Sequence, residues 1–395
     1  MPTRVEIPGS FTLPNETRLR LRTPKSVIIG ATTLNDIRDR LMRMQRMTDP
    51  RDVTVPLSKV GVYFVDGRMC ARFADTTGKP MLISTNGANH MAREVLPPRF
   101  WTGFRMLAQV NPKRAQGVWD DFSKFSTRDA VVRLNNHVVQ GEVRTIIRAV
   151  VSERYGMYAN ISMVQDILDA VPDLASLPVV DCWMTDNGIR IRFLVIDAAM
   201  AALSMFDPDV LKMGYIPMIE ISNSEVGCGT VSMVGGAYNV QTQEGLGHWD
   251  ETRRLDKRHL GQGFRFTEYI QETFKTFSED ANDIVQSYQA AREVDLEDPV
   301  EWLRDRLGMD REVPERVIEA TIAALDDPLV TPGRKLASIV DAMTIAAGLE
   351  SDIYTAKDVE AAAARLLKLG SDIAAKNGGL IKADVTKKKK EAKTA

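Results

Sequence analysis

Two X-Gly dipeptides between runs of alternating apolar residues restrict the fold of this 395-residue chain more than any other feature. Asp66-Gly67 and Asn187-Gly188 are typical of two-residue hairpin turns, because a type I′ turn needs positive φ at both central positions. Each dipeptide therefore predicts two antiparallel strands that follow one another in the chain. Antiparallel sheet is the expected framework.

The first hairpin has a predicted register. A turn at Asp66-Gly67 pairs Val65 with Arg68, and continuing the ladder pairs Gly61 with Arg72. Alternation then gives an apolar face made of Val60, Val62, Phe64, Met69, Ala71 and Phe73. The opposite face carries Tyr63, Arg68 and Arg72.

The second hairpin and one further strand repeat this arrangement. In the second hairpin the apolar face pairs Met184 with Ile191, and the other face sets Trp183 opposite Arg192 and Thr185 opposite Arg190. A strand over 143–151 places Arg144 and Arg148 on one face, beside Ile146. Three strands or hairpins thus each carry paired arginines on a single face.

The whole chain is predicted to be an α+β protein, in which an antiparallel sheet-rich central domain packs with a C-terminal helical layer. Residues 1–56 are expected to form an extended, proline-containing arm with one short helix at 34–47. Residues 57–263 form the β-rich core, with helices near 87–96, 100–110 and 160–170. Residues 264–380 form the helical layer, beginning with an apolar stripe over 266–288. Residues 381–395 are expected to be a disordered basic tail.

Charge is distributed unevenly along the sequence. Residues 93–154 contain eleven basic and six acidic side chains, whereas residues 277–330 contain five basic and fifteen acidic ones. An anionic partner would be attracted to the first segment and repelled by the second. The alternative is that the uneven distribution serves solubility alone.

Signatures of membranes, cofactors and metals are missing. No apolar run approaches the roughly 18 residues that a membrane span needs. The three cysteines form no CxxC pair, the four histidines have no ligand-like spacing, and neither GxGxxG nor GxxxxGK[ST] occurs. We therefore expect a cytoplasmic protein that has no membrane contact and carries neither a cofactor nor a metal.

The arginine-bearing faces predict a surface for single-stranded nucleic acid, with single-stranded DNA favoured. Such a surface needs cations along the phosphate path and aromatic platforms for the bases. The residues that supply these groups are Tyr63, Arg68, Arg72, Arg144, Arg148, Arg154, Trp183, Arg190 and Arg192. Two alternatives remain open: a solvated sheet face with ordinary cation–π contacts, and a face covered by the acidic C-terminal helices, whose carboxylates would pair with the arginines.

A polar segment after one strand is the second candidate site. Ser and Asn side chains bond readily to nearby backbone and favour a sharp turn. Its residues are Ser222, Asn223, Ser224, Glu225 and Gly227, and a second basic cluster further along contains Arg258 and His259. The segment either presents Asn223, Ser224 and Glu225 to a ligand or is a tight corner with satisfied polar groups. For the basic cluster, the alternative to a binding role is a solvated turn.

Three strings resemble the phage/plasmid-like protein family, a domain of unknown function. They are IRAVVSERYG at 147–156, ISNSEVG at 221–227 and RHLG at 258–261, and the similarity extends over roughly residues 90 to 370. Two strings depart from the usual family pattern: QTQEG at 241–245 replaces C-x-N-G, and GMYAN at 156–160 stands where an Asp-Asn pair is usual. The resemblance implies a protein of a phage, prophage or plasmid in the host cytoplasm, and suggests replication or recombination.

Three functions follow as hypotheses. The first is a non-enzymatic, self-associating nucleic-acid-binding protein of a mobile element, similar in role to single-strand annealing proteins. The second is a phage structural or assembly protein without affinity for nucleic acid. The third is a metal-dependent enzyme acting on nucleic acid through Glu220, Glu225, Asn223 and His259.

Overall fold

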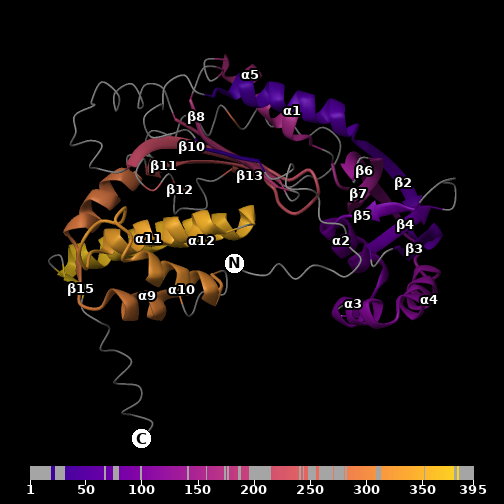
Figure 1. Ribbon diagram of the computed structural model, residues 1–395. Coiled ribbons are helices and arrows are strands. Elements are labelled where there is room, and N and C mark those ends of the chain that lie inside the picture. Colours follow the sequence, from indigo (N-terminus) through magenta and orange to yellow (C-terminus); the bar gives the residue numbers. More distant parts are fainter. Residues whose placement is uncertain are drawn as a thin grey trace, which may run out of the picture.

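The computed structural model has the predicted α+β fold, with two antiparallel-rich sheets and helices packed around them (Figure 1). It describes the residues 19–22, 32–65, 68–73, 80–97, 100–139, 142–156, 158–172, 175, 178–185, 188–194, 215–239, 242, 244–247, 255–257, 270, 280, 283–307, 313–350, 352–377 and 380–381. Among the helices in these ranges, none is both long and apolar enough to cross a membrane.

The first sheet, here called the N-terminal sheet, has the strand order β2-β6-β7-β5-β4-β3. Its strands are β2 (Arg51–Pro56), β3 (Val60–Val65), β4 (Arg68–Phe73), β5 (Met81–Ile83), β6 (Asp129–Val139) and β7 (Glu142–Ser152). All neighbours are antiparallel except β5 and β7. One face packs against three helices, namely α2 (Thr85–Val95), α3 (Phe100–Val110) and α4 (Pro112–Ser123).

The α2, α3 and α4 helices close the core of the N-terminal sheet. Trp119 of α4 is fully buried among apolar side chains, and its indole N–H donates to the Val60 carbonyl at 3.0 Å. Two of the three helices match predicted segments. The third, α4, was not predicted, although Asn111 caps it and Pro112 occupies its first position, where a missing N–H costs nothing.

The register predicted for the first hairpin is confirmed. β3 and β4 pair Val65 with Arg68 and Gly61 with Arg72, and the six apolar side chains share one face. Residues 66 and 67, on which the turn itself depends, lie outside the described residues. The face opposite the core therefore carries Tyr63 and Arg72, as expected.

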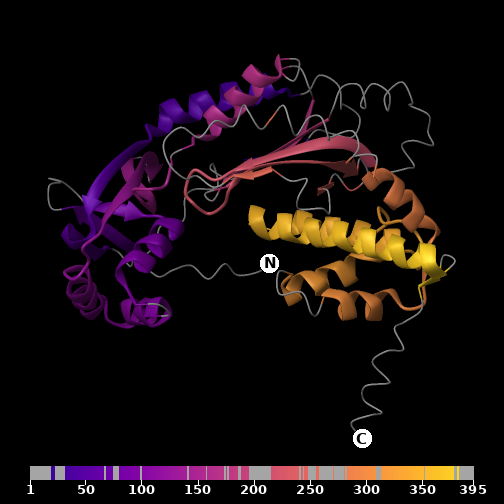
Figure 2. The same ribbon diagram turned by 180° about the vertical axis from the view of Figure 1, so that it is seen from behind.

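The second sheet, here called the central sheet, has the order β1-β8-β9-β10-β11-β12, with β13 beside β11. Its strands are β1 (Leu19–Arg22), β8 (Val179–Met184), β9 (Ile189–Leu194), β10 (Tyr215–Asn223), β11 (Val231–Asn239), β12 (Glu244–Gly247) and β13 (Leu255–Lys257). Helices α1 (Leu34–Thr48) and α5 (Asn160–Ala170) cover one face, and α11 (Leu336–Leu349) and α12 (Ile353–Asn377) lie on the other side (Figures 1 and 2).

The register predicted for the second hairpin is wrong by two residues. Trp183 pairs with Arg190 rather than Arg192, and the hairpin closes with the Thr185 N–H donating to the Gly188 carbonyl. The reason is that Gly188 serves a different purpose: a Cβ there would lie 2.3 Å from the Asn223 carbonyl oxygen of the neighbouring strand. A shift of two keeps every side chain on its predicted face.

The predicted N-terminal arm is also corrected. The helix expected at 34–47 is present as α1, and Thr33 and Asp36 cap it reciprocally. However, β1 pairs with β8 in the central sheet and β2 pairs with β6 in the N-terminal sheet. Residues 51–56 therefore belong to the β-structure rather than to an extended arm.

The C-terminal region is helical, as predicted. Its named helices are α9 (Pro299–Leu307), α10 (Glu315–Ala324), α11 and α12, and two short strands, β14 (Asp295–Leu296) and β15 (Leu380–Ile381), pair beside them in parallel. Most of the 266–288 stripe lies outside the described residues, but Ile270, Ile284 and Tyr288 are buried. Residues 382–395 of the predicted basic tail also lie outside the described residues.

Candidate ligand-binding site

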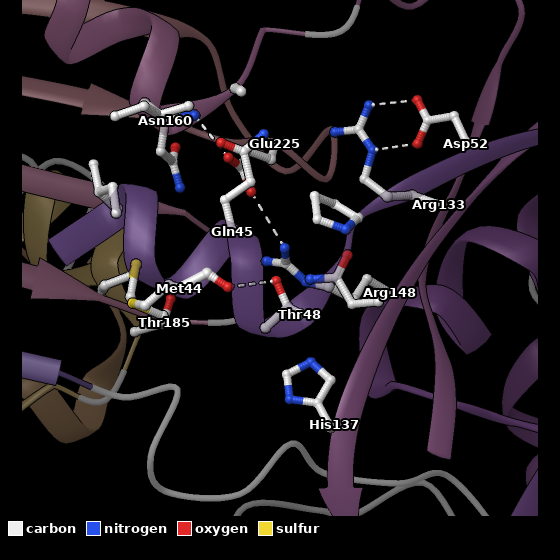
Figure 3. A pocket seen from close by; sticks show the side chains of 16 residues that line it. Met44, Gln45, Thr48, Asp52, Arg133, His137, Arg148, Asn160, Thr185 and Glu225 are labelled. Atoms are coloured by element: carbon white, nitrogen blue, oxygen red, sulfur yellow. Dashed lines mark hydrogen bonds and ion pairs between the residues drawn. The ribbon is translucent and has the colours of Figure 1, made fainter. Parts of the chain in front are cut away.

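A cavity of about 350 Å³ lies between the N-terminal sheet, the central sheet and α1 (Figure 3). Side chains from both sheets and from the helices α1 and α5 line it. The polar ones are Gln45, Thr48, Asp52, Arg133, Asn135, His137, Arg148, Asn160, Thr185 and Glu225. The apolar ones are Leu41, Met44, Pro50, Ala159, Ile161 and Met184.

Arg133 of β6 is held by a two-point ion pair with Asp52 of β2. Its Nε and Nη2 atoms donate to the two carboxylate oxygens at 3.0 and 3.1 Å. The Arg133 side chain is only 4% exposed, so the pair is shielded from solvent on the arginine side. Bidentate geometry of this kind fixes the guanidinium plane as well as its position.

Arg148 enters the cavity from an irregularity in β7. Arg133 pairs with Ala149 and Leu134 with Ile147, which leaves Arg148 as the extra residue of a bulge. Its Nη1 donates to Glu225 at 3.2 Å. The bulge thus directs a cation into the space between the two sheets.

Glu225 links the two sheets through a helix terminus. While one carboxylate oxygen accepts from Arg148, the other accepts from the Asn160 N–H at 2.7 Å. Asn160 is the first residue of α5, whose preceding residue provides no side-chain cap. The carboxylate therefore satisfies an otherwise open N–H at the positive end of the helix.

The turn after β10 is a buried corner in which Asn223 Oδ1 alone of the Asn223 polar atoms lacks a partner among the described residues. Ser222, Asn223 and Ser224 are all buried. The Asn223 amide donates to the Tyr158 carbonyl and to the Asn160 side chain, each at 2.9 Å. The proposal that Asn223 and Ser224 face a ligand is therefore wrong, because the corner uses these side chains internally; Glu225 alone of the segment lines the cavity.

The corner is fastened by Tyr155, a residue of the first family-like string. Its hydroxyl donates to the Ser224 carbonyl at 2.7 Å and accepts from the Gly227 N–H at 3.1 Å. Burial raises the pKa of Tyr155 to about 12, so the hydroxyl keeps its proton. Gly227 has φ of 74°, a conformation that favours glycine. The two family-like strings thus meet in space.

His137 lies beside Arg148 and is uncharged at neutral pH. Burial, and then the charge of Arg148, lower the pKa of His137 to about 4. Figure 3 shows Arg133 and His137 on either side of Arg148, with Met44 and Thr185 across from them. Arg133 and His137 were not predicted as site residues, because the consecutive polar residues Asn135, Asn136 and His137 obscure the alternation of this strand.

The second hairpin does not form the open cationic face that was predicted. Trp183, Arg190 and Arg192 are 6%, 1% and 0% exposed. The covered-face alternative is the one that the structure shows, because α12 packs there and contributes Glu360. The Arg190 guanidinium lies 5.1 Å from the Trp183 ring centre and donates to Glu360 at 3.0 Å.

Arg192 is surrounded by carboxylates. Four of them lie within ion-pair distance, namely Asp181, Glu220, Glu244 and Glu360. Burial opposes the charge on Glu220, but Arg190, Arg192 and Lys357 outweigh it and lower the pKa of Glu220 to about 2. Glu220 is therefore an ion-pair partner in the core, and the hypothesis that it holds a catalytic metal is wrong.

The remaining predicted residues lie on the N-terminal sheet. Arg72 sits 5.7 Å from the Tyr63 ring centre, and Arg144 pairs with Glu142 at 2.6 Å. Arg154 is exposed just beyond β7. The backbone of Arg68 is in β4, whereas its side chain, together with Arg258 and His259, lies outside the described residues.

A shallow hollow of about 440 Å³ opens at the edge strand β3 of this sheet. Tyr63, Arg72, Lys59 and Lys124 line it, together with Phe73, Asp120 and smaller residues. Lys124 is 69% exposed, and the nearest carboxylate recorded for it is Asp121 at 3.8 Å. The hollow therefore combines two aromatic side chains, of which Phe73 is buried in the core, with three cations and one carboxylate.

No three His, Cys, Asp or Glu side chains of the described ranges are arranged to hold a metal ion. Comparison with protein-family models, with curated proteins and with solved structures finds no match. The resemblance to the phage/plasmid-like family therefore stays a prediction.

Proposed function

We propose that this chain is a nucleic-acid-binding protein of a phage or plasmid, and that it takes up single strands on the N-terminal sheet. The observation that carries the proposal is the hollow beside β3, which Tyr63 lines together with Lys59, Arg72 and Lys124. Single-strand binding combines a cationic path for phosphates with an aromatic ring on which a base can stack.

The cationic path continues across the same face of the sheet. Arg144 lies on this face of β7, three strands from β3, which corresponds to about 15 Å at the usual strand spacing. Its side chain is 35% exposed, and its pair with Glu142 is at the surface. Exposed pairs contribute little to stability, so Arg144 can exchange Glu142 for a phosphate at small cost.

The test is fluorescence anisotropy of labelled single-stranded DNA, double-stranded DNA and single-stranded RNA over a salt series. We expect single strands to bind most tightly, with log affinity falling against log salt by about 0.7 per phosphate contact. The double variant Lys59→Glu/Lys124→Glu should flatten this slope and weaken binding at least tenfold. Tyr63→Leu should weaken binding by about 1–3 kcal/mol with the slope unchanged.

The matched control is Arg304→Glu/Lys368→Glu, on the C-terminal helices. These side chains are 56% and 44% exposed, and the change in net charge is the same. Equal losses in the two double variants would show that only total charge matters and would contradict a localised surface. Absence of binding by the folded wild-type protein at low salt would favour the structural or assembly function.

Self-association and strand annealing belong to the same proposal. Both are measurable on the same samples, by light scattering and by the rate at which complementary labelled strands pair. A protein that binds strands without accelerating their pairing would restrict the function to binding.

A further inference from the structure

The cavity between the two sheets differs from the β3 hollow because its charges are balanced internally. Arg133 pairs with Asp52 and Arg148 pairs with Glu225, so two cations meet two carboxylates. His137 adds no positive charge at neutral pH, since burial and Arg148 hold its pKa at about 4. A phosphate group would find no net positive charge here.

One wall of the cavity nevertheless has hydrogen-bonding capacity that the described residues leave unused. Three side-chain atoms on β6 are buried without a hydrogen-bond partner there, namely Arg133 Nη1, Asn135 Oδ1 and His137 Nε2. Arg133 and Asn135 are 3% and 5% exposed, so they are nearly withdrawn from solvent. Leaving a buried polar group unpaired costs about 1–3 kcal/mol, which a ligand with matching donors and acceptors would recover.

Much of the remaining surface of the cavity is apolar. Leu41 and Met44 come from α1, Ile161 from α5 and Met184 from β8. Methionine side chains are flexible and polarisable, and they make favourable contacts with aromatic rings. Pockets with apolar walls and a few convergent polar groups are typical of small-molecule sites of this size.

We infer that this cavity binds the planar, uncharged ring of a nucleobase, either in a free nucleoside or as one base of a strand. A nucleobase presents donors and acceptors along one edge and two apolar faces. Its edge would meet Arg133, Asn135 and His137, while its faces would contact Met44 and Met184. The inference does not depend on the β3 hollow, because the two sites have different residues, and the cavity is charge-balanced whereas the hollow is cationic.

The test is isothermal titration of the full chain with adenosine, guanosine, cytidine and uridine, with their 5′-monophosphates, and with inorganic phosphate. We expect at least one nucleoside to bind, its monophosphate to bind no more tightly, and phosphate not to compete. Met44→Phe, which places a ring in the cavity, should weaken nucleoside binding at least tenfold.

The control is Met47→Phe, the same substitution on the same helix. Met47 is 80% exposed and does not line the cavity, so binding should be unchanged. Circular dichroism and thermal unfolding of both variants confirm that each is folded. Met44 is half-buried at the cavity wall, and the substitution leaves the α1 core residues in place.

A second arm separates the two sources of the base. If free nucleosides do not bind, but Met44→Phe and not Met47→Phe weakens a short oligonucleotide, the ligand is a base within a strand. If the folded Met44→Phe and Met47→Phe variants bind nucleosides with equal affinity, and also bind oligonucleotides with equal affinity, the inference is overturned. Competition by inorganic phosphate also overturns it, since the cavity would then be an anion site. Nucleoside binding without strand binding would uphold this inference while refuting the proposed function.

Discussion

Glu360 is the residue through which α12 holds two arginines of the central sheet. It accepts from Arg190 at 3.0 Å and also pairs with Arg192, and its side chain is 3% exposed. The sequence places both arginines on one strand face, but it leaves open whether solvent or the acidic C-terminal helices cover that face. For this reason the composition of the face was predictable and its accessibility was not.

Replacing Glu360 with Gln should destabilise the fold by about 3–5 kcal/mol, because two buried guanidinium groups lose a shared counter-charge. The measurement is urea-induced unfolding followed by circular dichroism. Glu319→Gln is the matched control: Glu319 pairs with Arg304 at 3.0 Å, but it is 53% exposed. That change should cost less than about 1 kcal/mol. Similar losses in the two variants would contradict the buried-network interpretation.

At the scale of elements, the two hairpins show what the sequence can specify. The register of β3 and β4 follows from one turn dipeptide and strict alternation. The same rule applied to β8 and β9 fails by two residues, because Gly188 is needed for close approach to Asn223 rather than for the turn. A glycine in a sequence indicates that the backbone can adopt unusual conformations or approach another strand closely. The sequence does not show which of the two the fold uses.

The candidate cavity was only partly predictable for a related reason. Arg148 was identified from its strand, whereas Arg133 and His137 were not. Polar residues at alternate strand positions ordinarily face solvent. Here, however, α1 and the corner after β10 lie over that face and enclose it. Enclosure depends on how distant elements pack, which periodicity does not encode.

Gly236 of β11 offers a test at this scale. A Cβ at Gly236 would lie 2.1 Å from the Leu246 carbonyl oxygen of β12, so Gly236→Ala should force the two strands apart and lower the thermal midpoint. Gly117→Ala is the contrasting change, because Gly117 lies in α4 with nothing within 4 Å of the added atom. It should raise stability by about 0.5–1 kcal/mol. Thermal unfolding of the two variants should therefore give shifts of opposite sign.

At the scale of the whole molecule, two histidines lie where the N-terminal sheet meets other layers. Burial, and then Arg93, lower the pKa of His90 to about 4, and burial and Arg148 do the same for His137. His90 also contacts Cys228, in the corner after β10, at 3.9 Å. Both imidazoles are therefore neutral in the folded protein at pH 7.

These histidines predict a loss of stability in mild acid. An unfolded histidine has a pKa of about 6.5, so between pH 6.5 and 4 the unfolded chain binds protons that the folded chain does not. The free energy of unfolding should accordingly fall as pH drops through this window. Urea unfolding at pH 7.5 and 4.5 measures the change, and His90→Gln/His137→Gln should reduce the difference between the two values. An unchanged pH dependence in the double variant would contradict the assignment.

The burial of Arg192 against Glu360 also sets an order of events during synthesis. The two residues are 168 positions apart, and a ribosome adds about 5 to 20 residues per second. Roughly 10 to 30 seconds thus pass between the appearance of the arginine and that of its partner. Throughout that interval Arg192 has, among the described residues, only the carboxylates of the sheet itself, Asp181, Glu220 and Glu244, as partners. The face of the sheet that carries Arg190 and Arg192 therefore gains its cover and its last carboxylate only after α12 has been translated.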